Sequence, residues 1–341
     1  MSMTRSSPPI CKQCRQPIWG EYITALGASW HPDHFLCAGC GKPIGSEQYY
    51  VHQEAPYHAE CYQNQVAPRC AYCGKPLLDR YQVSQGKSYH PACFREHVAT
   101  RCVYCNKPLT GEYMVNHWGE HYCKEHQADY PTCAFCGRLV PSQQLEQGAR
   151  RNEYIRCPLC RSTAIESTAQ AQAIFTHLKQ RLTAQGLIFG NASFGLELCD
   201  RATIASLTQG RVGTDMLGIT VSTTQTINGR VVSTDVTKIA VLHGLPAILF
   251  QGVMMHESGH AWLTIQGIKN LPSWAEEGFC ELLSYRFYTE ENTVESRYHA
   301  ANIEKNPDKV YGEGFRRVRA LADTMGFSRF VETLRTTKRL P

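Results

Sequence analysis

The chain has 341 residues, enough for two or three domains. Its formal net charge of +5 is too small to indicate a nucleic-acid or membrane surface by itself. It has no apolar run of the about eighteen residues that cross a bilayer and no apolar amino-terminal segment, so we expect neither a transmembrane helix nor a signal peptide.

Cysteine is the residue whose number is unusual. The chain has 17 cysteines, and fifteen of them precede residue 161. Most form Cys-x-x-Cys pairs that alternate with histidines, a pattern typical of zinc sites and not of disulfides. Zinc thiolates require a reducing compartment, so we expect a cytoplasmic protein.

Residues 1–10 are short and mostly polar, and we expect them to be disordered. Residues 11–66 contain two sets of four zinc ligands, and each set consists of two close pairs, as tetrahedral structural zinc commonly does. The sets are Cys11, Cys14, His31 and His34, and then Cys37, Cys40, His58 and Cys61. Their spacing resembles that of a LIM domain with two zinc ions.

Residues 67–129 repeat this pattern, with eight residues instead of two between the two ligand sets. The sets are Cys70, Cys73, His90 and Cys93, and then Cys102, Cys105, Cys123 and His126. We therefore expect a second, LIM-like domain with an insertion and two zinc ions. Four ligands leave no coordination position for water, so these sites should stabilise small β-rich modules and not catalyse.

Residues 130–165 hold a fifth set, Cys133, Cys136, Cys157 and Cys160, which predicts a four-cysteine zinc ribbon that acts as a structural spacer. The alternative is nucleic-acid contact through four arginines, Arg150, Arg151, Arg156 and Arg161. No row of aromatic side chains accompanies them, so we favour the structural role.

Residues 166–341 begin with a predicted helix that Ser167 caps and Gly186 ends. Its expected buried face consists of Ala169, Ala173, Leu178 and Leu182. β-like runs follow at 196–199, 217–223 and 231–242, with a hairpin turn at Asn228-Gly229. The last run directly precedes the motif described next, and a free edge on it could bind an extended peptide. Cys199 and Cys280 have no pair partner and are predicted to be buried thiols.

The motif His-Glu-x-x-His occupies residues 256–260, in an apolar stretch that Pro246 opens as a helix. Residues i and i+4 share one helix face, so His256 and His260 can direct imidazole nitrogens toward one metal ion. Glu257 can then act as general base on a water bound there. Gly259 costs about 1 kcal/mol against alanine in a helix, which indicates a close neighbour, such as a second helix.

That second helix is expected over 274–285 and offers carboxylates for a third ligand. Glu276 and Glu277 are adjacent, so a helix can present only one of them to the metal, and Glu281 is a weaker alternative. A donor for the oxyanion should come from Tyr311, Tyr298 or His299, with Tyr311 preferred. A basic amphipathic helix is expected over 316–325.

Trp274-Ala-Glu-Glu277-Gly-Phe resembles the arrangement of glutamate-type zinc peptidases, the gluzincins. The combination of LIM modules, the four-cysteine bridge, Ala240-Val-Leu-His-Gly-Leu-Pro, the His-Glu-x-x-His helix and Tyr311-Gly-Glu-Gly-Phe is similar to the DA-one-type LIM-domain zinc peptidases. This resemblance covers residues 8–330. It implies an α+β zincin-type peptidase domain at 166–341, with Glu277 as third ligand and Glu276 orienting a histidine.

These observations predict a multidomain, monomeric, zinc-dependent endopeptidase with one catalytic and about five structural zinc ions. The expected partners are protein substrates, and the resemblance adds ubiquitin or ubiquitinated proteins as candidates. We expect neither nucleic-acid nor membrane binding. The alternative is a catalytically silent LIM-type adaptor, in which the His-Glu-x-x-His motif would be inert.

Overall fold

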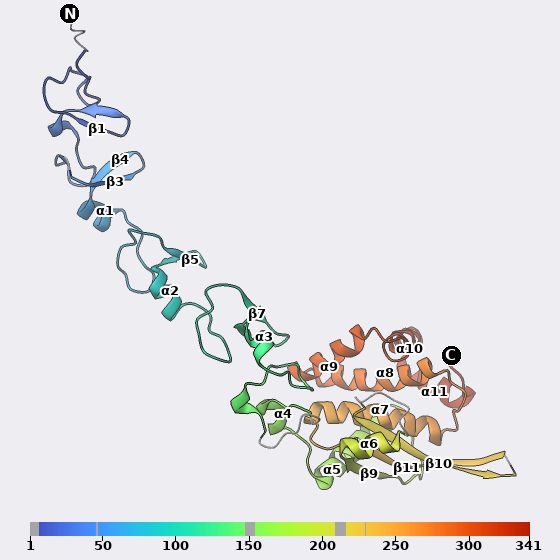
Figure 1. Ribbon diagram of the computed structural model, residues 1–341. Helices are drawn as coiled ribbons and strands as arrows, with labels where there is room; N and C mark the ends of the chain where they lie inside the picture. Colours follow the sequence, from blue (N-terminus) through green and yellow to red (C-terminus); the bar gives the residue numbers. More distant parts are fainter. Residues whose placement is uncertain (1–6, 46, 147–153, 209–215, 229) are drawn as a thin grey trace, which may run out of the picture. The chain divides into compact units, whose positions relative to one another are not determined.

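The computed structural model describes residues 7–45, 47–146, 154–208, 216–228 and 230–341 (Figure 1). The chain divides into two compact units, Met1–Tyr113 and Met114–Pro341. Within the described residues, no helix combines the length and the apolar character needed to cross a bilayer.

The first unit consists of β-hairpins and short helices. In chain order its elements are β1 (Ile23–Ala25), β2 (Ala28–Trp30), the 3-10 helix η1 (Pro32–His34), β3 (Tyr49–His52), β4 (Ala55–His58), α1 (Ala59–Gln65), β5 (Gln82–Ser84), β6 (Lys87–Tyr89) and α2 (Pro91–His97). Among its described residues the buried clusters are small, and the first consists of Ala25, Phe35, Cys37 and Ile44 with partly buried neighbours. Such cores cannot stabilise modules of this size alone, so the modules depend on metal.

A single backbone turn recurs at every Cys-x-x-Cys pair that begins a ligand set. In all five turns the amide of the first cysteine donates to the carbonyl five residues later, at 2.7 to 3.0 Å. The residue after the second cysteine has a positive φ in each, which explains why it is glycine at three of the five positions. These residues are Arg15, Gly41, Gly74, Asn106 and Gly137. The fifth set therefore begins with the same turn as the four sets in the LIM region.

The second unit carries the longer elements. β7 (Tyr113–Val115) leads into it, followed by β8 (His121–Cys123), α3 (His126–Asp129), η2 (Ser142–Gln144), α4 (Pro158–Ser162), α5 (Thr168–Ala184), β9 (Gly195–Cys199), α6 (Arg201–Leu207), β10 (Gly218–Ile227), β11 (Arg230–Leu242), α7 (Ala247–Ile265), α8 (Ser273–Glu291), α9 (Val294–Lys305), α10 (Gly312–Met325) and α11 (Phe327–Thr337). The chain is thus multidomain, with small zinc-binding modules followed by a helical and β region, as the sequence predicted.

Three strands form a sheet in the order β10–β11–β9, with β10 antiparallel and β9 parallel to β11. The hairpin between β10 and β11 confirms the expected turn, in which Asn228 has φ 50° and Gly229 lies outside the described residues. The sequence left open a free edge on the strand before the motif helix. β11 offers none, because it is the central strand, and β10 and β9 are the outer strands among those described.

Helix α7 carries the His-Glu-x-x-His motif and is buried on nearly all sides, between the sheet and helices α8 and α9 (Figure 1). Pro246 is its N-cap residue. Helix α8 is longer than the predicted 274–285, and α10 begins at Gly312, four residues before the predicted start. Helices α8 and α10 touch through glycines, since a methyl group on Gly278 would stand 2.4 Å from the Gly314 carbonyl.

Helix α5 begins at the predicted cap, where the Ser167 side chain accepts a hydrogen bond from the Gln170 amide. Its buried face was predicted only in part. Leu178 and Leu182 are buried, but Ala171 and Phe175 complete the face instead of Ala169 and Ala173. The buried face differs from the predicted one because the aromatic ring of Phe175 packs against Phe194. The spacing of the alanines did not reveal this contact.

The fifth zinc module belongs to the core of the second unit. Its four cysteines share one buried cluster with Phe250, in the first turn of α7, and with Leu245, which precedes that helix. The Ala247 amide donates to the Thr163 carbonyl, and the Ile165 amide donates to the Leu245 carbonyl, both at 2.9 Å. The predicted zinc ribbon would have a turn at each cysteine pair, but a helix begins at the second pair, where Cys157 is the N-cap of α4. The module is therefore a packed part of the domain and not a spacer.

Two of the four arginines considered for nucleic-acid contact, Arg156 and Arg161, lie in the described residues and are engaged within the protein. Arg156 pairs with Glu146 and Glu166, each at 2.7 Å, and Arg161 donates to the Gln144 carbonyl, also at 2.7 Å. Arg150 and Arg151 lie outside the described residues. The paired arginines give no support to nucleic-acid contact.

Candidate metal centres and catalytic cleft

Five groups of cysteine and histidine side chains converge as predicted. They are Cys11, Cys14, His31 and His34; Cys37, Cys40, His58 and Cys61; Cys70, Cys73, His90 and Cys93; Cys102, Cys105, Cys123 and His126; and Cys133, Cys136, Cys157 and Cys160. In each group the potential ligand atoms lie within 4.8 Å of one another. Each group supplies the four N and S ligands of a closed structural zinc site.

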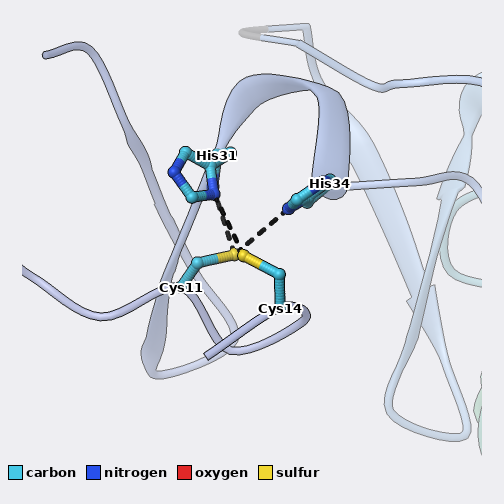
Figure 2. Close-up of side chains that lie close together, drawn as sticks. All are labelled: Cys11, Cys14, His31 and His34. Carbon is cyan, nitrogen blue, oxygen red and sulfur yellow. Dashed lines mark hydrogen bonds between the residues drawn. The ribbon is translucent and has the colours of Figure 1, made fainter. Parts of the chain in front are cut away.

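The distances within these groups fit zinc. Tetrahedral zinc bonds place neighbouring S and N ligands about 3.6 Å apart. In the first group (Figure 2), Cys11 Sγ lies 3.5 Å from His34 Nδ1, and Cys14 Sγ lies 3.4 Å from His31 Nδ1. The corresponding distance from Cys40 to His58 is 3.3 Å.

The outer nitrogens of two histidines are held in the way that zinc ligation needs. His58 Nε2 donates to the Pro43 carbonyl and His90 Nε2 donates to the Pro76 carbonyl, both at 3.2 Å. These hydrogen bonds fix the tautomer that leaves Nδ1 free as a ligand. The Cys11 thiol is also suited to bind zinc, because it loses its proton readily. Burial alone would raise the pKa of Cys11, but backbone amides that donate to its sulfur lower the pKa to about 5.

A different group forms where α7 meets α8. His256 Nε2 lies 3.2 Å from Oε2 of Glu277, and His260 Nε2 lies 3.4 Å from the same oxygen. Tetrahedral zinc places N and O ligands about 3.4 Å apart, so the two imidazoles and this carboxylate fit three corners of one coordination sphere. Three ligands of this kind leave a fourth position open, in contrast to the closed cysteine sites.

The outer nitrogens of both imidazoles also contact carboxylates. His260 Nδ1 lies 3.0 Å from Oε1 of Glu276, and His256 Nδ1 lies 3.5 Å from Oε1 of Glu281. Carboxylates in these positions fix ring orientation and tautomer. Glu276 thus contacts a histidine, the kind of contact that the resemblance implied for it. Glu281, weighed as an alternative ligand, lies instead on the Nδ1 side of His256.

The electrostatics of the group suit a cation. Burial alone would raise the pKa of Glu277, but its hydrogen bonds with His256 and His260 lower the pKa to about 2. Burial alone would lower the pKa of His256, yet the hydrogen bond with Glu277 raises it above the ordinary value. Burial also raises the pKa of Cys280 to about 12, so this thiol stays neutral. Cys199 and Cys280 are both buried, as expected.

Glu257 is 6% exposed and faces strand β10. The Thr220 hydroxyl lies 2.9 Å from its Oε2. A methyl group on Gly218 would stand 3.0 Å from its Cγ, so the strand backbone passes directly over the side chain. Neither residue was identified from the sequence. Gly218 and Thr220 lie in a predicted strand, but no local pattern says which strand passes the motif.

A cavity of about 430 Å3 opens beside His256 and Glu257. Apolar side chains of α7, of α9 and of the residues just before β10 contribute to its wall, among them Val253, Ile303 and Leu217. Two of the candidate oxyanion donors, Tyr311 and His299, also line it. Burial raises the pKa of Tyr311 to about 12, so its hydroxyl keeps its proton, and burial lowers the pKa of His299 to about 4.

The third candidate, Tyr298, faces another way. Its ring packs against Trp118 and His117, at centroid distances of 4.9 Å to each. The Trp118 indole donates to the Cys136 carbonyl at 2.8 Å. Tyr298 therefore joins α9 to the zinc modules and does not line the cavity.

Comparisons with known proteins agree with this organisation. The family model "DA1-like: Protein DA1" matches residues 179–297, and the LIM domain model matches residues 11–66 and 70–130. The chain is 22% identical to Protein DA1 of Arabidopsis thaliana over 97% of its own length and 68% of that protein. It is 24% identical to Protein DA1-related 1 of the same plant, over 98% of this chain and 67% of the relative.

A third relative is LIM domain-containing protein HDR3 of Oryza sativa subsp. japonica, 25% identical over 81% of this chain and 55% of that protein. The chain therefore spans only about half to two thirds of the length of these relatives. The DA1-like match contains the His-Glu-x-x-His helix and Glu277, and the LIM matches contain the first four ligand groups. The chain thus carries LIM domains followed by a DA1-like domain, and its homologues are Protein DA1 and the DA1-related proteins.

Proposed function

We propose that the protein is a zinc-dependent endopeptidase that cleaves protein substrates in the cavity between β10, α7 and α9. The observation that carries this proposal is the convergence of His256 Nε2 and His260 Nε2 on one oxygen of Glu277, at 3.2 and 3.4 Å. A metal ion bound by this group would supply Lewis-acid catalysis and activate water.

The side chains around the group support hydrolysis of an amide bond. Glu257 acts as general base, accepting a proton from the attacking water and delivering it to the departing amine. The Tyr311 hydroxyl, whose pKa of about 12 keeps it protonated, donates to the carbonyl oxygen as negative charge develops there. Glu276 orients His260 through the histidine Nδ1 atom, and Glu281 orients His256 in the same way.

The edge position of β10 suits an extended peptide. β10 is one of the two outer strands of the described sheet, and both its first residue, Gly218, and the preceding Leu217 line the cavity. A substrate that pairs with this edge would place its backbone beside Glu257. The LIM domains would hold protein substrates or partners, with ubiquitin or ubiquitinated proteins as candidates.

The test is cleavage of fluorescently quenched, unfolded casein by the purified protein, with and without phenanthroline. We expect cleavage that the chelator stops and that zinc restores. Glu257→Gln should abolish cleavage while zinc content and the unfolding transition stay unchanged. Glu332→Gln is the matched control, because Glu332 lies on α11 in an exposed pair with Arg335, and it should retain activity.

Two results would contradict the proposal. One is full activity of the Glu257→Gln variant, which would remove this carboxylate from the chemistry. The other is a zinc-loaded protein that binds casein without cleaving it, which would favour the alternative of a LIM-type adaptor.

A further inference from the structure

The Thr220 side chain contacts the proposed general base from a separate element of the fold. Its hydroxyl oxygen lies 2.9 Å from Oε2 of Glu257 and 2.8 Å from the backbone carbonyl oxygen of the same residue. Thr220 belongs to the edge strand β10, whereas Glu257 belongs to α7. We propose that Thr220 is a positioning residue that holds the Glu257 carboxylate in one orientation. This inference rests on the peptidase function proposed above.

The count of hydrogens explains why a hydroxyl suits this place. A threonine hydroxyl has one hydrogen to donate and two lone pairs that accept. Two acceptors of Glu257, its Oε2 and its backbone carbonyl oxygen, both lie within hydrogen-bond distance of that hydroxyl. An apolar side chain at position 220 could donate to neither, so the hydroxyl is the group that can orient the carboxylate.

The strand is shaped to allow this contact. Residues 218 and 220 lie on the same face of β10, because side chains alternate along a strand. A methyl group on Gly218 would stand 2.7 Å from Cγ1 of Val253 and 3.0 Å from Cγ of Glu257. The absence of a side chain at Gly218 thus makes room for the methylene groups of Glu257, while the Thr220 hydroxyl contacts its carboxylate. With Oε2 engaged, Oε1 is the oxygen left to accept a proton from water.

A simpler role for Thr220 would be to fasten β10 to α7. That role predicts a loss of stability when the hydroxyl is removed, but no specific loss of rate at saturating substrate. A positioning role predicts a fall in kcat with little change in KM, because the orientation of the base matters in the transition state and not for binding.

The experiment compares Thr220→Val with Thr220→Ser, using the casein assay and zinc analysis. Valine keeps the shape and removes the hydroxyl, and serine keeps the hydroxyl. A hydrogen bond to a charged group supports an expected fall in kcat of about tenfold to a hundredfold for valine, with KM changed by less than about threefold. Serine should retain kcat within about threefold. Thr224→Val is the matched control, because Thr224 lies on the same strand, exposed and opposite Thr234.

A double-mutant cycle gives a second readout that does not depend on activity. The denaturant midpoints of Thr220→Val, Glu257→Ala and the double variant are compared with that of the wild type. The shift caused by Thr220→Val should be smaller when Glu257 is already absent. Additive shifts, or an unchanged kcat in Thr220→Val, would overturn the positioning role. Absence of cleavage by the wild-type, zinc-loaded protein would instead overturn the peptidase proposal, and the cycle would still report on the contact.

Discussion

Gly259 of α7 lies so close to Cys280 of α8 that a methyl group at position 259 would stand 2.8 Å from the Cys280 sulfur. The same methyl group would lie 3.2 Å from Cα of Cys280, which is backbone and cannot turn away. The close neighbour that a glycine inside the motif helix indicated is therefore α8, the helix that carries Glu277. The missing side chain sets the separation of the two helices whose side chains form the candidate metal centre.

We therefore predict that Gly259→Ala disturbs the metal centre. The gain in helix propensity of about 1 kcal/mol should be offset by overpacking that costs about 1–3 kcal/mol. Because α8 must move to relieve the contact, zinc affinity should fall as well, as competition with a chromogenic chelator would measure. Gly195→Ala is the control, because an added methyl group there meets atoms no nearer than 3.7 Å. Equal zinc affinity in both variants would contradict the prediction, because it would show that the spacing of α7 and α8 does not affect zinc binding.

The carboxylates behind the imidazoles should contribute unequally to metal binding. We predict that Glu281→Ala lowers zinc affinity by about tenfold to a hundredfold, the range for lost partners of metal-bound histidines. Glu276→Ala should have a smaller effect, because the Glu276 side chain is 46% exposed and that of Glu281 only 18%. Water can replace the more exposed carboxylate. The comparison fails if Glu276→Ala weakens zinc binding more than Glu281→Ala does.

The ligand sets could be predicted from the sequence, whereas their surroundings could not. Cysteine and histidine pairs at fixed spacing carry their own geometry, because the turn and the metal both demand it, as at Cys11 and Cys14. The His-Glu-x-x-His helix is similarly local. Thr220, by contrast, reaches Glu257 from 37 residues away, and that contact depends on which strand takes the edge of the sheet. Strand order is a property of the whole fold and cannot be recognised from a short segment of the sequence.

The fifth zinc module shows the same limit. Its four cysteines were identified, but its burial against Leu245 and Phe250 was not, because the packing of one module on another depends on surfaces distant in sequence. The buried face of α5 was predicted only in part for a related reason. Alanines count as apolar in a periodic pattern, but larger side chains such as Phe175 decide which stripe is buried.

Removal of zinc should unfold the first unit before the second. The first unit has only small buried clusters, such as the one around Phe35 and Ile44, whereas the second has an extensive core. We expect a chelator to collapse the amide signals of residues 11–97 in an NMR spectrum while signals of α10 and α11 persist. Retention of dispersed signals from the β3–β4 hairpin in metal-free protein would contradict this dependence.

Arg156 should be a stabilising residue of the second unit and not a ligand-binding one. Its guanidinium group donates to the Gly244 carbonyl at 3.0 Å and pairs with Glu146 and Glu166. It therefore joins the fifth zinc module to the turn before α7. We predict that Arg156→Met lowers the unfolding free energy by about 1–2 kcal/mol, because the Arg156 side chain is 18% exposed but those of Glu146 and Glu166 are 33% and 53% exposed. Arg335→Met, in an exposed pair with Glu332, should cost less than about 1 kcal/mol.

The same cluster predicts a pH dependence. Burial alone would raise the pKa of Glu166, but the hydrogen bond from Arg156 lowers it below its ordinary value of 4.5. A carboxyl group whose pKa is lowered in the folded state stabilises the fold above its unfolded-state pKa. That stabilisation is lost as the pH falls below about 4.5 toward the folded-state value. Denaturant unfolding between pH 7 and pH 3 should therefore show a smaller acid sensitivity in Arg156→Met than in the wild type.

The indole of Trp118 should control the mobility of α9, one wall of the cleft. Its ring packs at a tilt against Tyr298, with the centroids 4.9 Å apart, and lies beneath the Arg138 guanidinium group at 4.0 Å. The next residue along α9, His299, lines the cavity beside Glu257. We predict that Trp118→Ala speeds hydrogen–deuterium exchange in α9 by about tenfold or more, since truncating a packed aromatic side chain costs several kcal/mol locally. Exchange in α11, which has no part in this contact, should not change. Unaltered exchange in α9 would show that the helix is held by its packing on α8 alone, and the zinc modules would then have no hold on the cleft through this contact.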